Sequence, residues 1–506
     1  MKLQRIFAAA LSGFLLMASV PALESDAAFV PDGAVASVTV NNVTSYYYDN
    51  PSSGGAEAMW NTAMTGTSAT VMLYADWNSS YGTRFGTGAG FIYDGALNVP
   101  SGHEITIDLN GYSINRNLEF AVEHGEVIHV AGGGTLNLTD TNQAVESGSI
   151  TGGNSQNGAG GIYIEAGGTV NMWGGNLTGN KSELSGGAVL LAGEGSLFSM
   201  SGGKIFNNSA QQCGGGVAVS DGTFKLANGD ITNNTGQDGG GIYAQAGEVS
   251  LSGGTVAQNT AVHGGGVLLN GTAAFTLKGK TAVQSNIASG ENRVGGGILA
   301  MGSMPIKIGG KPTVLNNSAD GVQSNLVFWQ ENAESNTVLP CHIQNVGTDI
   351  EAKIGVSLAG NLKSAIFAPD WSGSDCFICD AMDYALENQD GNLVLKRSLS
   401  YSSVVGNKKM LLLIVTCVLI ALAVIAILIL AFKKNTKEEE KPKTKKKVTA
   451  VKVSKKPKKE EPAEEEELDD DDEDEDEEDV EDIEDDEEYE DDEYEDDLDD
   501  EDEEEE

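Results

Sequence analysis

The chain has few of the residues that build metal sites or cysteine-based chemistry. Its 506 residues include only five cysteines and five histidines. The histidines are scattered along the chain, at His103, His124, His129, His263 and His342. No two of them stand at the spacing of metal ligands on one predicted face. We therefore predict neither a metal nor a cofactor.

One pair of cysteines has a motif-like spacing. Cys376 and Cys379 form a Cys-x-x-Cys sequence, which is half of a zinc site or a redox pair. A second Cys or His pair is missing, and no thioredoxin-like βαβ pattern surrounds the motif. We predict either a local disulfide between these two residues or free thiols.

Helical periodicity is absent from the long central part of the chain, where a repeat occurs six times. Each copy has a glycine run followed by three short apolar segments, and the copies begin at Gly160, Gly186, Gly215, Gly240, Gly265 and Gly296. In the second segment apolar and polar residues alternate, as with Val170 and Met172 around Asn171. A period of two predicts β-strands with one buried face, and repeats of this length predict a solenoid.

An asparagine follows the third segment of every copy, three positions after an aliphatic residue. The six asparagines are Asn180, Asn208, Asn234, Asn259, Asn286 and Asn317. Because this offset is constant while the repeats differ in length, we expect the asparagines to stack from coil to coil as a structural ladder. Three strands per coil and one ladder predict an all-β parallel β-helix, with about two further coils upstream.

Two further segments support this assignment by resemblance. Residues 104–111 (EITIDLNG), residues 132–140 (GGGTLNLTD) and the Gly-Gly-aliphatic repeats resemble bacterial cell-surface β-helix proteins of the pectin-lyase-like superfamily. The Gly-Gly-aliphatic and aliphatic-x-x-Asn signatures are also similar to polymorphic outer-membrane protein repeats. The resemblance covers about residues 100–328 and implies a right-handed parallel β-helix.

The two ends of the chain predict export and a membrane anchor. Lys2 and Arg5 precede an apolar run that ends in a small-residue cleavage site, which is typical of a signal peptide. Residues 410–432 carry no charge and are long enough to cross a bilayer. More lysines follow this run than precede it, so the positive-inside rule places the C-terminus in the cytoplasm and the β-helix outside. We expect a single-pass type I protein of the plasma membrane.

The net charge of −44 comes mostly from the C-terminal tail. Residues 460–506 include 39 acidic residues among 47 and no basic one, whereas residues 433–459 hold thirteen lysines. We expect both stretches to be disordered. The basic stretch is predicted to contact anionic lipid headgroups through Lys433, Lys434, Lys437, Lys445, Lys446 and Lys447. The acidic stretch would bind a basic cytoplasmic partner or fold back on the lysines; the alternative is a solvated flank and tail. No nucleic-acid binding is predicted.

These features divide the chain into seven predicted segments. They are the signal peptide (1–22), an N-terminal segment and cap (23–95), the parallel β-helix (96–328), a C-terminal cap or small β-module and stem (329–407), the transmembrane helix (410–432), the basic juxtamembrane segment (433–459) and the acidic disordered tail (460–506).

An apolar row is the strongest candidate for a binding surface. If Ile162, Val217 and Ile242 of the first strands point inward, the residues that alternate with them form an outward row. This row contains Tyr163, Val189, Ala218, Tyr243, Leu268 and Leu299. Such a row either binds a partner or sugar, or is covered by a turn or by the C-terminal module. The outward positions of the second strands hold no carboxylate, so we predict no catalytic residue. We expect adhesion or binding of an extracellular glycan or matrix polymer. The alternatives are a polysaccharide lyase or hydrolase and a purely structural spacer.

Overall fold

The computed structural model describes residues 30–48, 55–79, 90–92, 95–142, 147–330, 337–349, 351–360, 362–371 and 373–397. The predicted signal peptide, transmembrane helix, basic segment and acidic tail lie outside these residues. Within the described ranges, no helix is long and apolar enough to cross a membrane.

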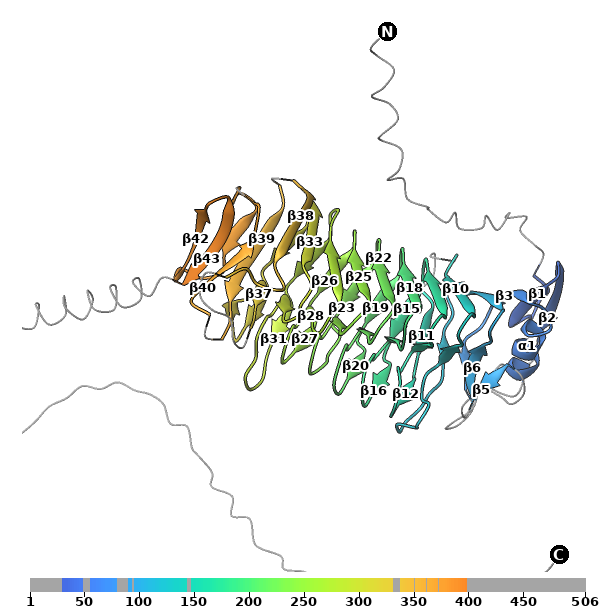
Figure 1. Ribbon diagram of the computed structural model, residues 1–506. Coiled ribbons are helices and arrows are strands. Elements are labelled where there is room, and N and C mark those ends of the chain that lie inside the picture. Colours follow the sequence, from blue (N-terminus) through green and yellow to red (C-terminus); the bar gives the residue numbers. More distant parts are fainter. Residues whose placement is uncertain are drawn as a thin grey trace, which may run out of the picture. The chain divides into compact units, whose positions relative to one another are not determined.

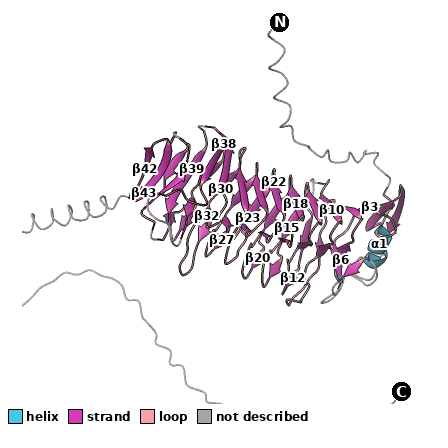
Figure 2. Cartoon of the chain, in the orientation of Figure 1, coloured by secondary structure: helices cyan, strands magenta, loops and turns pink. Residues whose placement is uncertain are grey.

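The described chain forms a parallel β-solenoid of about nine turns (Figure 1). Strands dominate it, and a short helix α1 (Gly55–Ala63) lies beside the first strands (Figure 2). Each turn contributes one strand to each of three faces, which we number in the order that follows the glycine run. This architecture confirms the prediction of an all-β parallel solenoid.

Face 1 holds the strands that directly follow the glycine runs. They are β6 (Ala96–Val99), β9 (Ile128–Val130), β13 (Ile162–Ile164), β17 (Val189–Leu191), β21 (Val217–Val219), β24 (Ile242–Ala244), β28 (Val267–Leu269), β32 (Ile298–Ala300) and β37 (Leu326–Phe328).

Face 2 holds the alternating strands. They are β3 (Ser68–Leu73), β7 (Glu104–Asp108), β10 (Thr135–Thr139), β14 (Thr169–Met172), β18 (Leu197–Met200), β22 (Thr223–Leu226), β25 (Glu248–Leu251), β29 (Ala274–Leu277), β33 (Ile306–Gly310) and β38 (Ile343–Thr348).

Face 3 holds the strands that precede the asparagines. They are β4 (Trp77–Asn78), β8 (Ile114–Asn115), β11 (Ser149–Thr151), β15 (Asn176–Thr178), β19 (Lys204–Phe206), β23 (Asp230–Thr232), β26 (Thr255–Ala257), β30 (Ala282–Gln284) and β34 (Thr313–Leu315). The strand β39 (Lys353–Leu358) pairs with β34 through its first residues and with β37 through its last.

A loop leaves the solenoid between face 3 and the next glycine run in most turns; we call it the side loop. Side loops carry two-residue strands that pair with one another. These are β12 (Asn154–Ser155), β16 (Lys181–Ser182) and β20 (Ser209–Ala210) in one group, and β27 (Thr260–Ala261), β31 (Ile287–Ala288), β35 (Ser318–Ala319) and β36 (Val322–Gln323) in another.

Additional strands cover the two ends of the stack. The hairpin of β1 (Ala36–Val40) and β2 (Val43–Tyr47) pairs antiparallel with β3, and β5 (Phe91–Ile92) pairs with β6. At the other end β41 (Phe377–Cys379) pairs with β39, and β40 (Ser364–Ala368), β43 (Asn392–Arg397) and β42 (Tyr384–Gln389) form an antiparallel sheet. An open end would expose unpaired backbone N–H and C=O groups, and these elements supply hydrogen-bond partners for the terminal turns.

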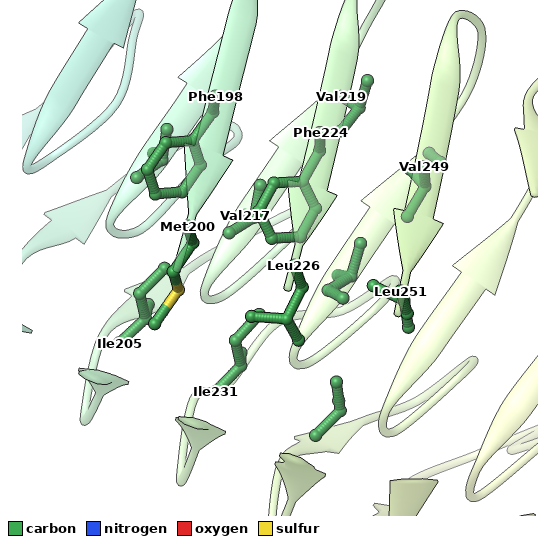
Figure 3. Packing of buried hydrophobic residues seen from close by; sticks show 14 of the residues in the cluster. Phe198, Met200, Ile205, Val217, Val219, Phe224, Leu226, Ile231, Val249 and Leu251 are labelled. Atoms are coloured by element: carbon green, nitrogen blue, oxygen red, sulfur yellow. The ribbon is translucent and has the colours of Figure 1, made fainter. Parts of the chain in front are cut away.

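The interior is a column of apolar side chains in strict register. Val170, Phe198, Phe224, Val249 and Phe275 occupy one position of face 2 in five successive turns. The rings of Phe198 and Phe224 stack at a centroid distance of 5.3 Å (Figure 3). All five side chains are buried, and each contributes about 1.5–3 kcal/mol of hydrophobic stabilisation.

The register of the second repeat differs from the prediction. The glycine in line with Gly160 and Gly215 is Gly187, not Gly186, and its strand begins at Val189. The cause is a Gly186-Gly187-Ala188 sequence where later turns have three glycines. Ala188 stands at the third glycine position and is fully buried. Matching the first glycine of this run to the second glycine of the others shifts the strand by one residue, which exchanges its inward and outward faces.

Candidate functional site

The six predicted asparagines lie in one hydrogen-bonded column inside the solenoid, and each is at most 1% exposed. The Asn234 side-chain oxygen accepts both the backbone N–H and the Nδ2 of Asn208, each at 3.0 Å. Asn234 Nδ2 in turn donates to Asn259 Oδ1 at 3.0 Å and to the Ile205 carbonyl at 2.9 Å. The same pattern recurs from Asn180 to Asn317. Every amide group of the column is therefore satisfied.

The residue before each of these asparagines has a left-handed backbone. These residues are Gly179, Asn207, Asn233, Gln258, Ser285 and Asn316, with φ between 55° and 67°. Glycine and asparagine adopt this conformation readily, which explains the Asn-Asn pairs in the sequence. Gln258 and Ser285 adopt it at a cost in backbone strain.

The column continues beyond the sequence repeat and ends at a carboxylate. Asn317 donates to Asn325, and the Asn325 backbone N–H and Nδ2 donate to Asp380 at 2.8 and 2.6 Å. The Ser357 hydroxyl donates to the same carboxylate at 3.0 Å. Because the column runs from donor to acceptor, its last group only needs to accept. Burial raises the pKa of Asp380, while its hydrogen bonds from Asn325 and Ser357 oppose that shift.

The predicted outward row on face 1 is present with one correction. Tyr163, Ala218, Tyr243, Leu268 and Leu299 occupy one position in successive turns. Val189 belongs to the core beside Ile162, and the outward residue of that turn is Leu190. The row extends to His129 at one end and to Val327 at the other.

Side loops cover most of this row. The residues just before the glycine runs pair in register along the loops: Ser185, Cys213, Asp238, His263 and Val294. Beneath them Tyr243, Leu268, Leu299 and Val327 form a second apolar cluster, against which Cys213, Val294, Met301 and Trp329 pack. Leu268 and Leu299 are only 2% and 1% exposed. Of the two interpretations of the row, cover by neighbouring turns is the one that the structure shows.

A groove of about 350 Å³ opens beside this cover. Its lining consists of Asp238, His263, Leu268, Asn270, Asn292, Val294, Leu299, Met301 and Trp329. The lining combines apolar side chains, the indole of Trp329 and four polar side chains, those of Asp238, His263, Asn270 and Asn292. His263 Nδ1 lies 2.7 Å from Asp238 Oδ1, so the carboxylate fixes the orientation of the imidazole. This combination of an aromatic ring, apolar side chains and a few polar groups is typical of a small-molecule or sugar site.

Tyr243 belongs to the same apolar cluster as the lining residues Leu268 and Leu299. It is 9% exposed, and its hydroxyl is hydrogen-bonded to the side chains of Asn270 and Cys213. Burial raises the pKa of this hydroxyl, so Tyr243 is neutral at physiological pH.

A buried charged cluster lies at the other end of the row. His129 is 2% exposed, and its two ring nitrogens lie 2.9 Å from Glu126 and 3.0 Å from Glu165. The Tyr163 ring stacks on the imidazole at 5.1 Å. Burial opposes a charge on His129, but the bonds to Glu126 and Glu165 outweigh it and raise the pKa of His129. His129 is thus held between two carboxylates.

The described cysteines are free thiols. Cys213, Cys341, Cys376 and Cys379 form no disulfide in the structure, and Cys376 and Cys379 are not bonded to each other. Burial raises the pKa of Cys341 to about 12 and that of Cys376 to about 11, which disfavours a reactive thiolate. Among the described residues, no group of histidines, cysteines and carboxylates could hold a metal ion.

Comparison with protein-family models, with curated proteins and with solved structures finds no match to the chain. Its class is the one that the fold above defines, a parallel β-solenoid with a ladder of asparagines inside and a row of side loops along face 1.

Sequence reasoning placed Leu268 and Leu299 in the outward row but missed the side-loop residues and Trp329 of the groove. Asp238 and His263 each stand directly before a glycine triplet, so the repeat itself puts them in adjacent turns. Reading the position before every glycine run would have found this column. Trp329 lies where the repeat ends, and no sequence pattern links it to the groove.

Proposed function

We propose that the chain is a membrane-anchored cell-surface protein whose right-handed β-solenoid binds an extracellular polymer, a glycan or a matrix component. The groove of Trp329, Asp238 and His263 carries this proposal, because a lining that combines an aromatic ring, apolar side chains and hydrogen-bonding groups suits a sugar ring. The apolar face of a sugar stacks on an aromatic ring, and its hydroxyls need donors and acceptors at the edge.

A binding assay with the full chain tests this function. Purified chain in a polyoxyethylene detergent, which carries no sugar headgroup, is applied to a glycan and matrix-protein array. Trp329→Ala should abolish the signal of the bound polymer. Phe120 is 79% exposed and does not line the groove, so Phe120→Ala is the matched aromatic control and should bind like the parent. Equal binding by both variants would refute the groove as the site.

The proposed membrane location and orientation rest on the charge pattern of the sequence. Residues 410–432 would span the plasma membrane, with the solenoid outside and the tail in the cytoplasm. Lys433 and Lys434 begin the segment proposed to contact anionic lipid, and the acidic tail would bind a basic partner. A peptide of residues 433–459 should bind phosphatidylserine vesicles with steep salt dependence; salt-independent binding would contradict the lipid contact.

A polysaccharide lyase or hydrolase is the second candidate. The superfamily resemblance suggests it, and the paired Asp238 and His263 favour it, because an imidazole held by a carboxylate at the edge of a groove is suited to proton transfer. Product analysis in the binding experiment separates the two functions. Release of oligosaccharides that stops with His263→Gln would establish the enzyme, and intact polymer would support the binder. A protein that binds nothing would be a structural spacer.

A further inference from the structure

The described residues that line the groove include no free cation for an anionic ligand. The lining includes one carboxylate, Asp238, and one imidazole, His263, which is already bonded to that carboxylate. None of the nine lining residues is a lysine or an arginine. Anionic sugars are usually held by lysine or arginine through charge-assisted bonds, and this lining offers none.

The arginine nearest in sequence to the groove lining is already engaged. Arg293 stands between the lining residues Asn292 and Val294, but its guanidinium donates to the Asp320 carboxylate and to the Gly290 carbonyl at 2.7 Å. The charge of Arg293 is thus balanced locally. Residues 1–432 contain 33 acidic and 18 basic residues, so the exported part of the proposed protein carries a net negative charge.

The polar groups of the groove suit hydroxyls instead. Asn270 and Asn292 carry amides that both donate and accept, and a carboxylate such as that of Asp238 accepts hydrogen bonds from sugar hydroxyls. A ligand carboxylate or sulfate at the same place would meet a like charge, which is repelled over the Debye length of roughly 8 Å at physiological salt.

We propose that the groove takes a neutral glycan and rejects polymers of uronic acids or sulfated sugars. This inference rests on the proposed function and specifies its ligand class. The partly exposed side chains of Trp329, Val294 and Met301 would receive the apolar face of the sugar, and Asp238 would accept hydrogen bonds from its hydroxyls.

Two pairs of matched polymers test directly whether the charge of the ligand decides binding. Alginate and polygalacturonate are each compared with their carboxyl-reduced forms, in which every uronate has become a neutral hexose, alongside mannan and a mixed-linkage glucan. Affinity electrophoresis of the full chain should show binding of at least one neutral polymer. Each acidic parent should bind about tenfold more weakly than its reduced form at low salt, and added salt should narrow this difference.

Variants of the groove test whether the charge of Asp238 causes the discrimination between acidic and neutral polymers. Asp238→Asn removes the like charge, so the discrimination against the acidic parent should shrink. Glu119→Gln, an exposed carboxylate in a side loop four turns away, should leave the discrimination unchanged. Acidic polymers binding as tightly as neutral ones in a Trp329-dependent way would overturn the ligand class and leave the proposed function standing. No binding of any polymer, or binding indifferent to Trp329→Ala, would overturn both.

Discussion

Removing one amide from the asparagine column should destabilise the solenoid far more than removing an exposed asparagine. In Asn234→Ala, the Asn208 backbone N–H and Nδ2 lose their acceptor, and the Ile205 carbonyl loses a donor. Asn234 is fully buried, so water cannot replace these partners. Each orphaned group costs about 1–3 kcal/mol, so the three together should cost at least about 3 kcal/mol.

Asn234→Asp tests the donor-to-acceptor direction of the hydrogen bonds along the column. The aspartate keeps the acceptor for Asn208 but points a second oxygen at Asn259 Oδ1 and at the Ile205 carbonyl, where the amide donated. We expect a buried carboxylate with a pKa well above the usual value of about 3.9. The folded state then binds more protons than the unfolded state, so the variant loses stability as pH rises from about 4 to that raised pKa. The penalty should be relieved in acid.

Urea denaturation followed by circular dichroism measures both effects. Asn228→Ala, an exposed asparagine of the same turn, is the control and should change the free energy of unfolding by less than about 0.5 kcal/mol. Hydrogen exchange should also show faster exchange of the Asn208 amide in Asn234→Ala. An Asn234→Ala midpoint equal to that of Asn228→Ala would refute the account of the column.

Three further predictions concern single residues. Gln258→Asn should stabilise the fold by about 0.5–1 kcal/mol, since asparagine tolerates the φ of 57° at this position better than glutamine does. Asn233→Gln should destabilise the fold by a similar amount. Urea midpoints measure both changes, and shifts in the same direction for the two variants would refute backbone strain at Gln258. Asp380→Asn should cost about 1–2 kcal/mol, because an amide group would face donors from Asn325; a neutral change in the thermal midpoint would argue against a required acceptor. Because the pKa of His129 is raised in the folded state, its protonation contributes stability that is complete below about pH 6.5 and is lost as pH rises through the folded pKa. The difference in unfolding free energy between the parent and His129→Gln should therefore narrow as pH rises. A difference that stays constant from about pH 5 to 9 would refute the raised pKa.

The sequence predicts the repeated part of this fold well because its determinants are local. Val170 and Met172 alternate with Asn171 inside a single strand, and the aliphatic-to-asparagine offset spans three residues, so both patterns are visible without tertiary information. The error at Val189 arose where the local signal is ambiguous, because Ala188 replaces a glycine and two alignments of the run fit equally well. One residue of slip is enough to exchange a core position for an outward one.

The groove was harder to predict because its side-loop residues occupy equivalent positions in the repeat but are of different residue types. The side-loop position before the glycine run holds Cys213, Asp238 and His263 in consecutive turns, and no single residue type marks it. Asp380 closes the column from 55 residues beyond Asn325, outside the repeat. Contacts of this kind depend on how the last turns are built, which a periodic pattern does not encode.

The position of the groove follows from a change in the side loops. In the preceding turns, the side-loop residues before the glycine run cover the outward row of face 1, as Val294 does beside Leu299. The next loop, from Asn317 to Asn325, instead folds into an antiparallel hairpin of β35 and β36 that contributes no residue to the lining, and β39 passes from face 3 to face 1 without a loop. Trp329 and Met301 complete the cover instead, and they leave the space that forms the groove. The site therefore lies where the loop cover of the repeat ends, so the groove is a product of the irregular last turns rather than of the repeat itself.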